Sequence, residues 1–209
     1  MKPLFNQEAQ RKVAQAVAEA EAKTSAEIAV MVVGHSGRYR EAEILAAILW
    51  GHLLAFLITV NLKTPSLWLY IPQEFIYSGL FFLLTRRFPW LKRPFISPGR
   101  RKDKVRLRAQ RAFFEHGLHL TREATGVLIF ISLFERRVMI LADRGVMAKV
   151  SQESLDHLAT RLARAMREGR ASEGLCEVIR QLGELLSRHL PPRPDDTNEL
   201  PNEIIIRQE

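Results

Sequence analysis

The stretch GVLIFISLFERRVMILAD, residues 126–143, decides the fold class of this chain. Its first eight and last seven residues are mostly apolar and rich in β-branched side chains, which is typical of buried strands. The residues FERR, 134–137, where the second run begins, carry three charged side chains. The pattern predicts two antiparallel strands, residues 126–133 and 137–143, joined by a tight turn.

A third strand is predicted upstream, at residues 26–34, where AEIAVMVVG is apolar and closed by glycine. More than ninety residues separate it from residues 126–133. Such a crossover connection makes two neighbouring strands parallel. Amphipathic spacing predicts helices around the strands, at residues 6–23, 104–120, 152–168 and 172–189. The fold class is therefore α/β: a sandwich with a central mixed sheet flanked by helices.

Two apolar runs interrupt this pattern, at residues 44–62 and 67–85. The first has no charged side chain, and the second contains Pro72, Gln73 and Glu74. A bilayer core needs about 20 apolar residues in a helix, which each run supplies. The alternative is a pair of buried helices in a soluble core, but a chain of 209 residues offers little core for two such runs. We therefore predict a two-helix transmembrane hairpin inserted in the crossover, where its ends remain close together.

Charge predicts the orientation of this hairpin. Only Lys63 lies in the turn between the runs, whereas residues 86–111 contain eleven Lys or Arg and one acid. By the positive-inside rule both flanks, and so both termini, are cytoplasmic. The basic flank lacks the further features of a nucleic-acid interface, so the expected partner is the lipid bilayer and no nucleic acid. The single cysteine, Cys176, excludes an intramolecular disulfide.

His52 and Glu74 are polar residues within the two runs, at similar distances from the turn. In an antiparallel hairpin they reach similar depth, which predicts an intramembrane polar pair that shares a hydrogen bond. The alternative is a hydrated Glu74 near the outer interface, beside a kink at Pro72.

The segments EAKTSAEIAVMVV and RAFFEHGLHLTREATGVLIFISLFERRVMILADRG resemble the TPM domain. The features that carry the resemblance are the Thr-x-x-Glu-Ile lead-in to the first strand, the Gly-Val-Leu-Ile strand and the Asp-x-Gly exit from the third. With the closing PDDTNELPNEI, the chain most resembles the bacterial membrane branch, in which a transmembrane hairpin splits the domain. The resemblance implies a TPM-like sandwich and a bacterial inner membrane location. It also implies calcium binding at an acidic sheet end, as in some members, or acid phosphatase activity, as reported for others.

Three carboxylates are expected at one end of the sheet, namely Glu27, Glu123 and Asp143. They lie at the start of the first strand, before the second, and at the end of the third, and convergent carboxylates suit calcium or magnesium. Asp195, Asp196 and Glu199 of the tail are further candidates for that end. The alternatives are an ion-paired Glu27 and an Asp143 that caps its own backbone in a turn. Ala124 and Thr125 stand where active family members carry acidic or amide residues, which removes an expected ligand.

These observations predict three regions: one discontinuous cytosolic domain, residues 1–41 and 97–192; the hairpin with its basic flank, residues 42–96; and an acidic tail, residues 193–209. No catalytic set is complete. The leading hypothesis is therefore a membrane-anchored binding or accessory module for another envelope protein, with oligomerisation left open. The alternative is a divalent-metal-dependent phosphatase, with calcium or magnesium as its ion and no organic cofactor.

Overall fold

The computed structural model describes residues 5–63, 66–192 and 203–207. The chain forms two compact units, residues 1–36 together with 102–209, and residues 37–101. The first unit holds the strands, and the second holds the two apolar helices. The tail carboxylates Asp195, Asp196 and Glu199 lie outside the described residues.

The sheet of the first unit has four strands in the order β3-β2-β1-β4. β1 (Ile28–Val33) runs parallel to β2 (Val127–Ser132), and β3 (Arg137–Ala142) runs antiparallel to β2. β4 (Ile205–Arg207) pairs in parallel with the other side of β1. The three predicted strands and their directions are confirmed, and the mixed α/β class with them.

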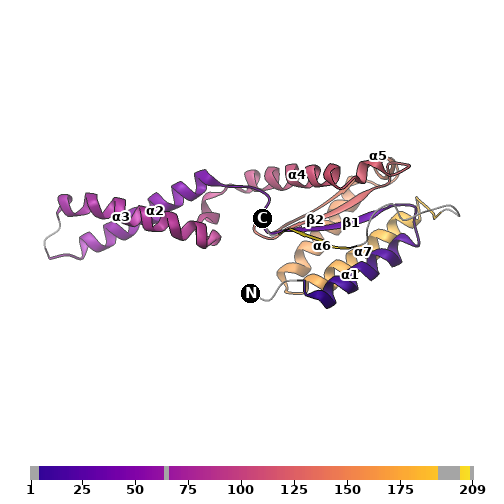
Figure 1. The fold of residues 1–209 in the computed structure, drawn as a ribbon, viewed down its shortest axis with the longest axis horizontal. Helices are drawn as coiled ribbons and strands as arrows, with labels where there is room; N and C mark the ends of the chain where they lie inside the picture. The colour runs from indigo at the N-terminus through magenta and orange to yellow at the C-terminus, as the bar shows by residue number, and fades with distance from the viewer. Residues whose placement is uncertain (1–4, 64–65, 193–202, 208–209) are drawn as a thin grey trace. The chain divides into compact units, whose positions relative to one another are not determined.

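Helices cover both faces of this sheet (Figure 1). One face packs against α1 (Gln7–Glu21), α6 (Gln152–Arg167) and α7 (Ala171–Ser187), which share one apolar core with Val30 and its face of the sheet. The other face, with Met31, packs against α4 (Pro98–Glu115). Every residue of β1 and β2 is buried. Because alternate residues of a strand point to opposite faces, this burial requires helices on both faces of the sheet. Two short elements complete the unit, η2 (Leu118–Leu120) and α5 (Arg144–Met147).

The strand β4 is not predicted from the sequence, from which residues 193–209 were expected to form an acidic tail. Its three residues pair with β1, Ile205 beside Met31 and Arg207 beside Val33. Ile205 also packs against the core on the α4 face. Three residues are too few to show alternation, so only the tertiary partner reveals this strand.

The pairing of β4 predicts different effects for prolines at Ile205 and Ile206. Gly34 donates its N–H to the carbonyl of Arg207, so the backbone groups of Arg207 and Ile205 face β1, and those of Ile206 face outward. Ile205→Pro removes a ladder hydrogen bond and a packed side chain, and should lower the free energy of unfolding by about 2 kcal/mol. Ile206→Pro is the matched control and should cost much less. Urea unfolding of the full chain in detergent micelles measures both; equal losses would contradict the pairing.

The second unit is built from α2 (Arg40–Val60) and α3 (Leu67–Arg87), which lie side by side (Figure 1). Small side chains recur every fourth residue on the buried face of α2: Ala47, Gly51, Ala55 and Thr59. Small residues at this spacing let two helices approach closely, as in membrane helix pairs. A Cβ atom at Gly51 would lie 2.5 Å from the backbone nitrogen of Ser78 on α3.

Large apolar side chains cover the outside of this unit. Phe75 is 75% exposed and Leu83 64% exposed, and both lie on α3. Each helix is 21 residues long and apolar enough to cross a membrane by length and composition. The predicted pair of span-length helices is therefore present.

The 3-10 helix η1 (Pro89–Phe95) follows α3 and is tied to α2. The indole N–H of Trp50 donates to the carbonyl of Leu91 at 3.3 Å, and the rings of Trp50 and Phe95 meet edge to face. Lys92 is almost buried and pairs with Glu43 at 2.5 Å. Part of the basic flank thus stabilises the second unit itself.

Candidate functional site

The predicted metal ligands lie next to strand termini that share one end of the sheet. Ile28 of β1 pairs with Val127 of β2, and Val127 pairs with Ala142 of β3. Glu27 and Asp143 adjoin these residues, and Glu123 lies three positions before Gly126, whose carbonyl accepts from the N–H of Asp143. The topological part of the prediction is therefore correct.

The carboxylates themselves do not gather into a metal site. Among the described residues, no group of three or more His, Cys, Asp or Glu side chains is placed to hold a metal ion. Asp143 is the N-cap of α5, and its Oδ1 accepts the N–H of Arg144 at 2.7 Å. Glu27 is 8% exposed at the start of β1. The backbone-capping alternative therefore describes Asp143.

Thr125 stands where a ligand was expected and has a structural role. Its Oγ1 donates to the carbonyl of Ser25 at 3.0 Å, and its N–H donates to Oγ1 of Thr121 at 3.0 Å. Ala124 before it has φ +54°, in the left-handed region. These contacts connect the segment before β2 to the residues before β1, and they use polar atoms that a metal ligand would need free.

The polar pair of the hairpin is brought together, with a third member. Nδ1 of His52 on α2 lies 3.1 Å from Oε2 of Glu74 on α3. The hydroxyl of Tyr70 lies 2.6 Å from the same His52 nitrogen and donates to Oε2 of Glu74 at 3.1 Å. Ser78 donates to the other oxygen of Glu74 at 3.3 Å. Glu74 thus lies within hydrogen-bond distance of His52 on α2 and of Tyr70 and Ser78 on α3.

One proton arrangement satisfies this cluster. If Nδ1 of His52 donates to the Tyr70 hydroxyl, that hydroxyl remains free to donate to Glu74. Tyr70 lies four residues before Glu74, one helical turn away, and the sequence analysis missed it. The sequence feature that could have indicated Tyr70 is a hydroxyl-bearing side chain four residues before Glu74, within an otherwise apolar run.

A side chain of the cluster remains uncovered within the second unit. The His52 side chain is 58% exposed, whereas that of Glu74 is 22% exposed. His52 lies in a groove of about 420 Å³ that is otherwise lined by apolar and aromatic side chains, among them Leu53 and Phe56. The cluster therefore presents a polar edge within an apolar surface.

A second missed residue is Glu135, in the turn between β2 and β3. It is 2% exposed, and both its oxygens accept the N–H of Ser36, at 3.1 and 3.2 Å. Ser132 donates its hydroxyl to Glu135, and Ser36 donates to the hydroxyl of Ser132 at 2.7 Å. This carboxylate joins the β2–β3 turn to the segment that leaves β1. A single acidic residue in a tight turn between two apolar strands could have indicated a structural role for Glu135. Its partner Ser36 could not be identified in the same way, because it is 99 residues away.

Comparisons with known proteins agree with this architecture. The family model of the TPM domain matches residues 98–185, which run from α4 almost to the end of α7. Among solved structures, the chain is similar to the NMR structure of the BA42 protein from the psychrophilic bacterium Bizionia argentinensis. The TM-score is 0.60 with 20% sequence identity, over 99% of this chain and 97% of that chain. At this identity the likeness shows the fold alone. No curated protein matches the chain.

Proposed function

We propose that this chain, which carries a TPM domain at residues 98–185, is a membrane-anchored module that binds another envelope protein of the bacterial inner membrane. In this proposal α2 and α3 cross the bilayer as a hairpin and hold the α/β unit at the cytoplasmic surface. The basic residues of the flanks, Arg38 and Arg40 near the start of α2 and eleven Lys or Arg in residues 86–111, against Lys63 in the turn, support this orientation.

The observation that carries the proposal is the uncovered edge of the hairpin cluster. Polar atoms in the hydrocarbon region are costly unless protein covers them, so ionisable residues of membrane helices usually face other helices. More than half of the His52 side chain is exposed, within a groove lined by Leu53 and Phe56. A neighbouring transmembrane helix would cover both the polar edge and the apolar groove.

Site-specific photo-crosslinking in native membranes tests this proposal. A photoreactive side chain at Leu53, in the groove, should give one discrete adduct with another membrane protein. The same probe at Leu83, which is exposed on α3 and does not line the groove, is the matched control and should give none. In the Leu53 probe protein, His52→Leu should reduce the adduct, because the polar contact is lost.

Two results would contradict this function. The absence of any discrete protein adduct at Leu53 would mean that lipid covers the groove. An adduct only with a second copy of this chain would mean that the hairpin self-associates and does not recruit another protein.

A further inference from the structure

A cavity of about 350 Å³ lies between the β2–β3 turn and α6, within the first unit. Three arginines line it, Arg136 and Arg137 from the turn and the start of β3, and Arg167 from the last turn of α6. None of the described residues that line it is acidic. The nearby acid, Glu135, is buried and accepts hydrogen bonds from Ser36 and Ser132. The described lining of the cavity therefore contains three basic residues and no acidic one.

Arg136 occupies a backbone position that arginine does not favour. Its φ of +51° is in the left-handed region, where glycine is the usual residue of a turn of this kind. A side chain held at such a position costs about 1 kcal/mol relative to glycine, and strained positions cluster at functional sites. Here the strained residue is an arginine that lines the cavity.

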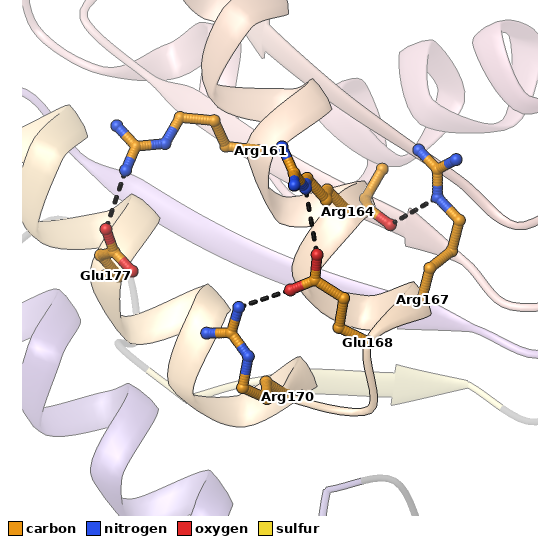
Figure 2. A network of polar contacts seen from close by, with 7 residues as sticks. Arg161, Arg164, Arg167, Glu168, Arg170 and Glu177 are labelled. Carbon is orange, nitrogen blue, oxygen red and sulfur yellow. Dashed lines mark hydrogen bonds and ion pairs between the residues drawn. The ribbon is translucent and has the colours of Figure 1, made fainter.

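Arg167 differs from the other arginines around the end of α6 (Figure 2). Arg161 pairs with Glu177 at 2.9 Å, and Arg164 and Arg170 both pair with Glu168, at 3.0 and 2.5 Å. Arg167 contacts a main-chain oxygen instead, with its Nε donating to the carbonyl of Ala163 at 3.2 Å. Within the part of the chain that the structure describes, neither Arg136 nor Arg167 forms an ion pair with an acid. Two guanidinium groups at the cavity thus retain the capacity to bind an anion.

The place of the cavity in the fold also fits a ligand site. Ser132, which lines it, is the last residue of β2, and β2 is parallel to β1. Open α/β sheets bind ligands outside the carboxyl ends of their parallel strands. The predicted metal site lies at the other end of the sheet, so the two are separate.

We propose that the cavity bounded by Arg136, Arg137 and Arg167 binds a phosphate group, carried either by an anionic lipid headgroup or by a soluble phosphate ester. Planar guanidinium groups bind phosphate oxygens through paired, charge-assisted hydrogen bonds. The apolar lining, from Val138 and Met166, would contact the organic part of the ligand. This inference does not depend on the partner proposed for the hairpin.

The test uses the full chain in a neutral maltoside detergent, with two probes. Titration calorimetry measures the binding of inorganic phosphate, and native mass spectrometry measures the binding of phosphatidic acid against phosphatidylcholine. The test variant is Arg136→Gln/Arg167→Gln. The matched control, Arg161→Gln/Arg164→Gln, removes the same charge from acid-paired arginines of α6. All four side chains belong to exposed residues, so both variants should remain folded.

The expected result is a loss of affinity of at least about tenfold in the test variant and little change in the control. If inorganic phosphate binds in this way, the site accepts soluble phosphates. If inorganic phosphate does not bind, and phosphatidic acid binds more tightly than phosphatidylcholine, the phosphate is carried by a lipid headgroup. The proposal is overturned if neither probe binds the parent protein, or if both variants lose affinity equally, which would indicate a general charge effect.

Discussion

Replacing Gly51 with leucine is expected to force α2 and α3 apart, whereas the same change at Gly79 should leave them packed. A Cβ atom at Gly51 would lie 2.5 Å from the backbone nitrogen of Ser78 and 2.6 Å from its Cα, which cannot move without the helix. A Cβ atom at Gly79 meets nothing within 4 Å. Both changes add the same side chain to the same hairpin, so the contrast isolates the close approach.

A cysteine pair at Thr59 and Gln73 would report this separation, because the side-chain oxygens of the two residues lie 3.3 Å apart across the hairpin. In a Cys176→Ser background, the rate at which a short bifunctional thiol reagent joins the two cysteines should fall by about tenfold or more in Gly51→Leu, as the cost of overpacking implies. The rate in Gly79→Leu should match the parent. Equal rates in the two variants would contradict the described packing of α2 on α3.

Replacing Glu135 with alanine is expected to lower the free energy of unfolding of the first unit by about 3 kcal/mol. The change deprives the Ser36 N–H and the Ser132 hydroxyl of their acceptor inside the protein. The matched control is Glu177→Ala, which removes an ion-paired but exposed glutamate and should cost less than about 1 kcal/mol.

The reactivity of Cys176 in urea measures this loss, because it is the only cysteine and it packs against the core of the first unit. Burial raises the pKa of its thiol, which further slows its reaction in the folded chain. In the Glu135→Ala variant the urea midpoint should fall clearly below that of Glu177→Ala. Similar midpoints would mean that Glu135 contributes no more than a surface residue.

The sequence was sufficient for those parts of the fold that repeat a local pattern. Residues 126–143 predicted β2, β3 and their turn, and the long segment between the first two strands predicted that they run in parallel. The small residues Ala47, Gly51 and Ala55 recur every fourth residue in the sequence, but only the folded hairpin shows that they lie on the buried face of α2. β4 could not be predicted because three residues are too few to show an alternating pattern. The strand forms because it pairs with the edge of β1 that β2 does not occupy.

The candidate sites followed the same division. The position of a residue along an antiparallel helix pair follows from the number of residues between it and the turn. His52 and Glu74 could therefore be predicted to lie at the same level, and the structure places Nδ1 of His52 3.1 Å from Oε2 of Glu74. The carboxylates at the sheet end were placed correctly along the strands, but their side-chain directions depend on local turns. The cap that Asp143 provides for α5 is such a turn. The cavity arginines could not be predicted, because Arg136 and Arg167 come from elements far apart in the chain.

The central claim is that α2 and α3 form a membrane hairpin whose two ends both emerge on the cytoplasmic side. Cysteine labelling in intact bacterial spheroplasts tests it most directly, with single cysteines introduced in a Cys176→Ser background. Lys63→Cys, at an exposed position just after the end of α2, should react with a membrane-impermeant maleimide in intact spheroplasts. Glu153→Cys, exposed on α6, should react only after permeabilisation. Labelling of both sites in intact cells, or of neither, or recovery of the protein in the soluble fraction after a carbonate wash, would contradict the account.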